Sequence, residues 1–451
     1  MRTWQRRARR NRTAKASLVT PLAALLGFAG IGPATAASSP ADSTGSVPPT
    51  NCAAPVPATP SAAQLAACGY SITPLTSISP LPDGGSKYIY GDDTTEEFVP
   101  PADFNPITAT QAELYTYGFP ARPDVSAADY QGWNNVYGKL AHVDPAPPFL
   151  FSNPSARINT VPALTATARL AAQKAGTKRV KQIEALLANS RALIALQNQA
   201  RKHPPVVAHV NSNQGDCIVN GSVACYAGYD DVSSGGYFFT AVQGAYYEPT
   251  IGPTRCTDNG TFYWLGLGDG NTVSNELGQA GTAQGDTTMP NDEAFWESTA
   301  DQNAVQSEGN TIPQGDALIV SAQFVFGGTN GRNAYRFTWY DNTTHTSLPN
   351  LIFYTNSFSG HTAEGKVEAV NDGVSTSKPL INFGNNMGFD FMQDNFLELG
   401  FDQFGYWSVY NQISAKYEIQ RGLSGFTLAS TSALSQKNNS SWWTVSQQSC
   451  N

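Results

Sequence analysis

Carboxylate and amide side chains are the strongest candidates for chemistry in this sequence of 451 residues. Glu364, Lys366 and Glu368 alternate along one stretch, and Gln279 lies among small residues in another. A carboxyl group can take a proton from water and return it to a leaving nitrogen. An amide donates N–H to an oxyanion and does not titrate in acid. Carboxylate and amide chemistry is therefore what these residue types can supply.

Other common kinds of site find little support in the sequence. The five His include no pair at zinc-ligand spacing, and neither a Gly-x-Ser-x-Gly elbow nor a phosphate-binding Gly loop is present. The balance of 27 Lys+Arg against 35 Asp+Glu leaves no basic stripe for nucleic acid. We therefore expect no metal, no cofactor and no nucleic-acid partner.

The alternation of residues predicts which side chains share a face. In an extended segment, Glu364, Lys366 and Glu368 would point to one side of the sheet. Around Gln279, the alternate neighbours are small or apolar, which would leave room for a substrate backbone. Lys366 would stand about 7 Å along the strand from Glu364, close enough to stabilise that carboxylate in its ionised form.

Four segments of the sequence stand in an order and spacing typical of one known family. They resemble the glutamic peptidases, the G1 or eqolisin family of the scytalidoglutamic and aspergilloglutamic peptidases, in its bacterial secreted form. The resemblance covers nearly all of residues 220–395. The four segments are residues 225–229, 242–249, 264–282 and 363–368, with further matches at 294–297, 312–316 and 379–384 and, before this region, at 109–114 and 117–123.

The resemblance implies a concanavalin-like or lectin-like β-sandwich with a Gln and a Glu as its catalytic dyad. By motif position the dyad is Gln279 and Glu364, and we expect both side chains to line one cleft with room for a water. Trp264, Glu297 and Tyr226 would line the same cleft. Gly365 and Lys366 replace the aromatic and aliphatic residues usual after the catalytic Glu, so a changed pH range or a weakened activity is an alternative.

The residue pattern itself also predicts an all-β fold for the C-terminal part of the chain. After Val206, short alternating runs recur about every ten residues between Gly- and Asn-rich turns, as at 237–242, 318–325 and 335–340. Many short strands with such turns are typical of an antiparallel sandwich. We assign residues 207–451 to this domain.

The N-terminal end reads as a secretory signal. Residues 2–15 carry seven basic and no acidic side chains, residues 16–32 are mostly apolar, and small residues follow up to Ala37. We assign residues 1–37 to the signal peptide and expect a secreted protein with no membrane segment in its mature form. An even cysteine count suits an oxidising compartment. The local guesses are Cys52–Cys68 and Cys217–Cys225, which leaves Cys256–Cys450.

Residues 38–206 are assigned to a prosegment with a disordered leader, a Pro-rich part and a basic amphipathic helix at about 160–202. From residue 207 onward the chain holds 8 Lys+Arg and 23 Asp+Glu, whereas residues 157–202 hold 9 Lys+Arg and one Glu. The basic helix is thus either a solvated linker or a cover that leaves the acidic cleft when low pH neutralises carboxylates. Maturation is expected near residues 200–210.

Two other classes of function remain as alternatives. A secreted carbohydrate-binding sandwich would use its exposed aromatics and amides on sugars, since fold alone does not decide function. A glycoside hydrolase would use Glu297 and Glu364 as its carboxyl pair. The favoured hypothesis is a monomeric acid endopeptidase that acts on proteins or peptides and binds its own prosegment.

Overall fold

The computed structural model describes residues 60–127 and 130–152 and, with gaps, residues 209–447. Contacts divide the chain into Met1–Val47 and Pro48–Asn451, and every described residue belongs to the second unit. The predicted signal peptide, the basic helix at 160–202 and the domain boundary at 206/207 lie outside the described residues. Among those described, no helix has the length and apolar character needed to cross a membrane.

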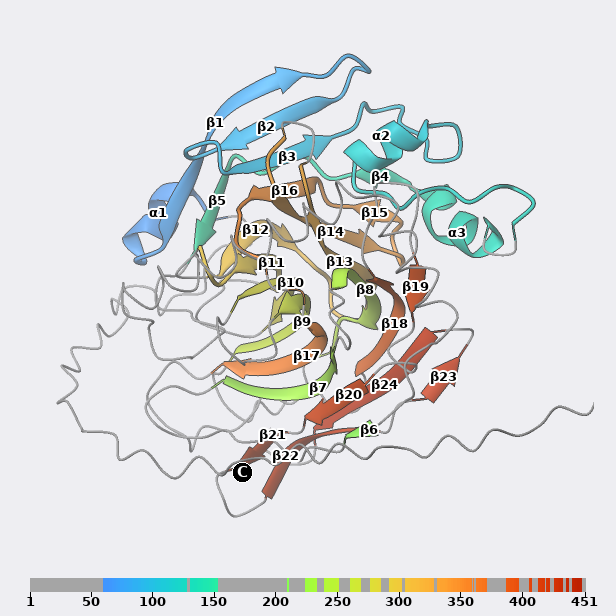
Figure 1. The fold of residues 1–451 in the computed structure, drawn as a ribbon. Helices are drawn as coiled ribbons and strands as arrows, with labels where there is room; N and C mark the ends of the chain where they lie inside the picture. The colour runs from blue at the N-terminus through green and yellow to red at the C-terminus, as the bar shows by residue number, and fades with distance from the viewer. Residues whose placement is uncertain are drawn as a thin grey trace, which may run out of the picture. The chain divides into compact units, whose positions relative to one another are not determined.

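One layer of the domain, sheet I, is antiparallel except at one edge (Figure 1). Residues 61–152 are called here the N-terminal segment, and one short strand of this segment, β5, forms part of sheet I. At the far edge of the sheet, β6 pairs in parallel with β20. Its strand order is β5 (Phe149–Ser152), β12 (Gln306–Thr311), β11 (Glu293–Ser298), β10 (Leu277–Gln284), β9 (Gly260–Gly268), β17 (Thr362–Val370), β7 (Ala224–Val232), β20 (Ile413–Tyr417), β6 (His209–Val210).

The second layer, sheet II, begins with two strands of the N-terminal segment. Short strands extend it at several points: β4 (His142–Val143), β15 (Thr346–Ser347), β19 (Gly405–Trp407) and β23 (Ser435–Lys437). Its main order is β2 (Ser86–Tyr90), β3 (Thr95–Val99), β16 (Asn350–Tyr354), β14 (Ala334–Asp341), β13 (Ala317–Val325), β8 (Phe239–Tyr247), β18 (Met387–Phe396), β24 (Ser440–Gln447), β22 (Phe426–Thr431), β21 (Ile419–Arg421).

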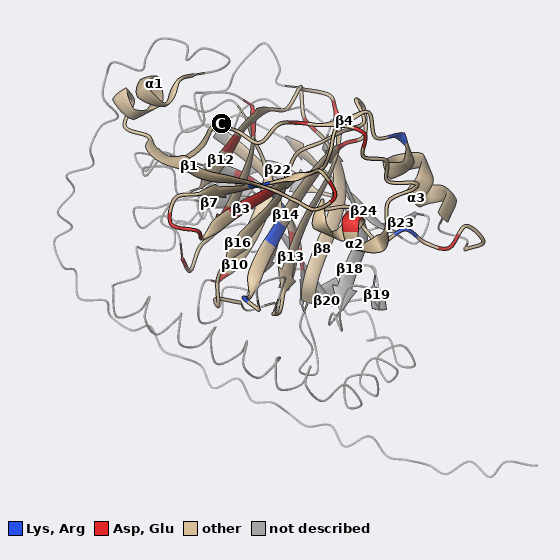
Figure 2. Cartoon of the chain, turned by 90° about the horizontal axis from the view of Figure 1, so that it is seen from above, with Lys and Arg blue, Asp and Glu red and all other residues tan. Residues whose placement is uncertain are grey.

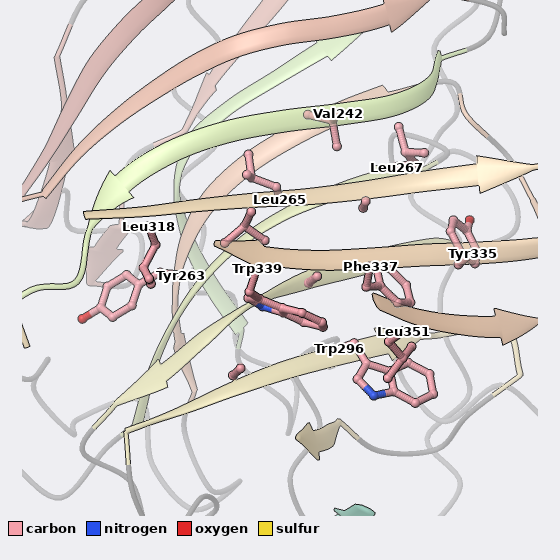
Figure 3. Close-up of a cluster of buried hydrophobic side chains, with 14 of the residues drawn as sticks. Val242, Tyr263, Leu265, Leu267, Trp296, Leu318, Tyr335, Phe337, Trp339 and Leu351 are labelled. Carbon is pink, nitrogen blue, oxygen red and sulfur yellow. The ribbon is translucent and has the colours of Figure 1, made fainter. Parts of the chain in front are cut away.

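The core lies between the two sheets, where alternate side chains of each strand meet. Leu265 and Leu267 of β9 in sheet I and Phe337 and Trp339 of β14 in sheet II belong to this cluster (Figure 3). The indole N–H of Trp339 donates to the carbonyl oxygen of Gly281 at 2.9 Å, which satisfies its polar atom and ties the layers together. Each such buried side chain contributes about 1.5–3 kcal/mol. The predicted all-β sandwich is confirmed.

The N-terminal segment is built into both sheets. Strand β1 (Ser71–Pro80) pairs with β5 through its first half and with β2 through its second. Helices α1 (Ala62–Ala67), α2 (Gln111–Thr116) and α3 (Tyr130–Val136), with the 3-10 turn η2 (Tyr137–Lys139), complete it. α2 begins at a capping box in which Thr110 and Glu113 each bond the other's backbone N–H. Its buried side chains and those of α3 cover the outer face of sheet II.

The predicted disulfides and the predicted acidic character can be compared with the structure only in the described residues. Cys68 is disulfide-bonded, and because its partner is outside the described residues the three pairings stay predictions. Acidic residues occur on strands of both sheets, with Lys and Arg at few places (Figure 2). This distribution agrees with the excess of Asp and Glu in residues 207–451.

Candidate active site

Gln279 and Glu364 lie on either side of the same residue. Gln279 of β10 is opposite Gly266 of β9 in the sheet register, and Glu364 of β17 is opposite Gly266 from the other side. Directly opposed residues of antiparallel strands project to the same face. Both side chains therefore stand on one face of sheet I, called here the site face. Gly266 itself has no side chain, and the position over it, called here the gap over Gly266, lies next to Leu277, whose Cδ1 would be 2.8 Å from a Cβ added at Gly266.

The prediction that Glu364, Lys366 and Glu368 share a face is confirmed by this register. Trp264 is opposite Lys366 and therefore stands on the site face as well. Its indole Nε1 donates to Glu368 Oε2 at 3.0 Å, and the Lys366 ammonium lies 5.4 Å from its ring centroid. Tyr226 occupies the register position opposite Glu368. The five residues thus occupy neighbouring positions on three strands.

Glu364 is held by a hydroxyl group and by a buried ammonium. Thr362 Oγ1 donates to Glu364 Oε1 at 2.5 Å, and Lys366 Nζ donates to Oε2 at 2.7 Å. The same ammonium lies 2.6 Å from Asp230 Oδ1, and Asp230 is opposite Glu364 in the sheet register. All three charged side chains are buried. A buried cation requires paired anions, and the single Lys366 ammonium is shared by both carboxyl groups.

Glu364, Gly266 and Gln279 form a row of opposed residues across β17, β9 and β10, and Glu297 of β11 extends this row beyond Gln279. It lies opposite Gln279 in the register of β10 and β11, and Gln279 Nε2 donates to its Oε2 at 2.8 Å. Burial raises the pKa of Glu297 to about 7, and the hydrogen bond from Gln279 opposes part of that rise. The row therefore contains a carboxyl group that keeps its proton in acid, on the side of Gln279 away from Glu364.

The site face is covered in this form of the chain. Gln279 is fully buried and Glu364 is only 5% exposed. The sequence predicted a cleft with room for a water between them, and in this form both side chains are buried instead. Apolar side chains of the N-terminal segment pack onto the same face of sheet I. These are Leu65 of α1, Tyr70 and Phe151, in contact with the cluster of Phe262, Trp264, Leu277, Ala283, Phe295 and Val305. Helix α1, through Leu65, contributes to this cover. The predicted basic helix at 160–202 lies outside the described residues.

The positions of Asp230 and Glu364 resemble two ligands of a cation, but Lys366 Nζ already lies between them and supplies the positive charge. Among the described residues, no cluster of three His, Cys, Asp or Glu side chains is arranged to hold a metal ion. The expectation that no metal or cofactor takes part stays a prediction.

Sequence reasoning missed three contributors to the site. Asp230 lies directly after the segment 225–229 that was recognised, and its alternation with Gly228 was a usable signal. Thr362 stands two residues before Glu364, on the same strand face. Gly266 could have been found only from strand pairing, because it matters by lying between Gln279 and Glu364, which are distant in the sequence.

Comparisons with known proteins give limited similarity. No family model and no curated protein matches the chain. Solved structures that match it include scytalido-glutamic peptidase with a peptide-based transition state analogue, with 16% sequence identity and a TM-score of 0.35. SCP-B, described as a member of the eqolisin family in complex with a tripeptide, has 16% identity and a TM-score of 0.34. In both cases 51% of this chain and 100% of the other are covered.

Proposed function

We propose that this protein is a secreted, acid-acting endopeptidase in which Gln279 and Glu364 form the catalytic pair. The register that places both side chains on one face, one strand to each side of Gly266, supports this assignment most directly. Two strand spacings put their Cα atoms about 10 Å apart. In this form Gln279 Nε2 bonds Glu297 and Glu364 Oε1 bonds Thr362. To hold one peptide group and one water molecule between them, the two side chains have to turn toward each other and Leu277 has to move away from Gly266.

The chemistry follows from the groups that surround each side chain. Glu364, paired with Lys366, takes a proton from the attacking water as general base, and the new hydroxyl bonds to the carbonyl carbon. The Gln279 amide donates N–H to the oxyanion, a contribution of about 3–4 kcal/mol. Glu364 then gives its proton to the leaving nitrogen as the C–N bond breaks. No covalent intermediate with the protein is needed.

We further propose that the chain is made as a precursor whose N-terminal segment inhibits it. Leu65 of α1 is fully buried against side chains of the site face. A substrate would have to occupy this face to reach Gln279 and Glu364. Removal or displacement of the segment is therefore the activating step, and proteins or peptides are the expected substrates.

The glycosidase alternative fits the geometry less well. Glu297 and Glu364 are three strand spacings apart, about 14 Å between Cα atoms, and the Gln279 amide stands between them. A glycosidase needs its two carboxyl groups to flank the scissile bond, and here the amide occupies the place between them. Sugar stacking is also poorly served by Trp264, because its ring is buried and its N–H is bonded to Glu368.

The test is cleavage of a denatured protein at pH 3–5, after the precursor has been incubated in acid. We expect cleavage that survives pepstatin and disappears in Gln279→Ala and Glu364→Gln. Asp124→Asn, an exposed change in the N-terminal segment, is the matched control and should cleave normally. Polysaccharide binding without proteolysis at any pH would contradict the proposal and favour the lectin alternative.

A further inference from the structure

The two ends of the Gln279 amide have unequal environments. Its nitrogen donates to Glu297 Oε2 at 2.8 Å. Its oxygen, Oε1, has no hydrogen-bond partner among the described residues, although the side chain is fully buried. A buried polar atom without a partner costs free energy, so this arrangement leaves the amide only half satisfied.

If the Gln279 nitrogen is bonded to Glu297, the oxygen is the atom left to contact a substrate, and if the oxygen is bonded to Glu297, the nitrogen is left. An ionised carboxylate only accepts hydrogen bonds, so it must bind the NH₂ end of Gln279. The oxygen and nitrogen of an amide point in directions about 120° apart, so the end held by Glu297 is turned away from Gly266. An oxygen presented to the gap would repel the oxyanion that the proposed reaction forms.

We propose that Glu297 is a positioning residue whose neutral carboxyl group turns the NH₂ end of Gln279 toward the gap over Gly266, and whose ionised form turns it away. This inference rests on the proposed function for its catalytic meaning. The contact that carries it is the pairing of Glu297 with Gln279 across β10 and β11.

The proton accounts for both orientations. When Glu297 is neutral, its O–H donates to Gln279 Oε1, which satisfies that oxygen and frees both N–H groups. When the proton leaves to solvent, the carboxylate accepts from Nε2 and the amide turns back. Burial raises the pKa of Glu297 to about 7, so the neutral, productive form prevails in acid.

The other charged groups on the site face do not favour the ionised form at Glu297. On its own strand Glu293 lies four residues away, and across Gly266 the nearest charged side chains are Glu364, Lys366 and Asp230, which pair with one another. Helix α1, which covers part of this face, has neither acidic nor basic side chains. The exchange of one proton at Glu297 is therefore the event that turns the amide.

The first measurement follows the environment of the Gln279 side-chain amide by NMR and does not depend on enzymatic activity. In the full chain labelled with ¹⁵N-glutamine, the Gln279 side-chain NH₂ signal, assigned by its loss in Gln279→Ala, should shift between pH 5 and 8 with one midpoint near 7. The shift should vanish in Glu297→Gln and persist in Glu293→Gln, a buried acid on the same strand. A Gln279 signal that does not change with pH, or that still titrates in Glu297→Gln, overturns the inference.

The second measurement reads the pH profile of cleavage. In the natural chain, kcat/KM should fall about tenfold per pH unit above 7, and this fall should be absent in Glu297→Gln, whose amide cannot titrate. A fall that persists unchanged in Glu297→Gln overturns the inference. If no variant cleaves protein while the Gln279 signal titrates as expected, the proposed function fails and the coupling of the two side chains stands.

Discussion

Glu97 of β3 and Glu308 of β12 bring two carboxyl groups together in the buried interior, one from the N-terminal segment and one from the sandwich. Glu97 is fully buried and Glu308 nearly so, and Tyr90 OH donates to Glu97 at 3.2 Å. Burial raises the pKa of Glu97 to about 7 and that of Glu308 well above its usual range, with the neighbouring carboxylate adding to the rise at Glu308. Burial of the pair is therefore favourable only when the carboxyl groups are protonated.

Stability should consequently be highest in acid. Both carboxyl groups hold protons more tightly in the folded chain than in the unfolded one, so the free energy of unfolding falls as pH rises from about 4.5 through 7. We expect a loss on the order of a few kcal/mol, measured by urea unfolding at several pH values. Glu97→Gln should flatten this dependence, whereas the exposed Asp124→Asn should leave it unchanged. An equally steep dependence in Glu97→Gln would contradict the explanation.

Gly266→Ala tests the gap over Gly266. The added Cβ would lie 2.8 Å from Leu277 Cδ1 and 3.1 Å from the Cβ of Gln279, which is overpacking that costs about 1–3 kcal/mol. We expect kcat/KM to fall at least about tenfold with the fold retained by circular dichroism. Gly132→Ala in α3 meets nothing within 4 Å; it should leave activity unchanged and raise stability by up to about 1 kcal/mol through helix propensity. Full activity in Gly266→Ala would argue against a substrate in this gap.

Lys366→Met tests the buried ammonium between two carboxylates. Without it, Asp230 and Glu364 lose their shared cation, and breaking a buried pair costs about 3–5 kcal/mol. Adding Asp230→Asn to that variant should restore part of the lost stability, since one of the two buried charges is then gone. Lys87→Met is the comparison: Lys87 is 22% exposed although its partner Glu96 is only 4% exposed, so the loss should be smaller than in Lys366→Met. Additive losses in the double variant would rule out the shared ion pair.

Leu65→Ala tests the inhibitory role of α1. Removing a fully buried leucine side chain costs about 2–5 kcal/mol of packing, here at the contact between α1 and the site face. We expect faster peptide cleavage by the intact precursor and faster hydrogen exchange in β9 and β10. Ala66→Ser, on the exposed side of the same helix, should change neither. Unchanged cleavage together with faster exchange would show that α1 does not limit access.

Much of the fold could be predicted because local patterns determine it. The alternation around Lys366 placed Glu364 and Glu368 on one face, and the structure agrees. The cover by Leu65 and the place of Asp230 depend on pairing between distant segments, which alternation does not report. The sequence indicated only a Pro-rich part of the prosegment there, but β1 and β3 form because β5 and β16 supply their partners.

Strand β1 has a consequence for the proposed removal of the N-terminal segment. Its first four residues pair with β5 in sheet I, and its second half pairs with β2 in sheet II, so it bridges the two layers at one end of the sandwich. Peeling the N-terminal segment away would bare the backbone of β12 and of β16 at once. Unpaired edges of that kind recruit other strands. An activated molecule would therefore have two new places at which copies could join into aggregates, so keeping part of the severed segment in place would protect it.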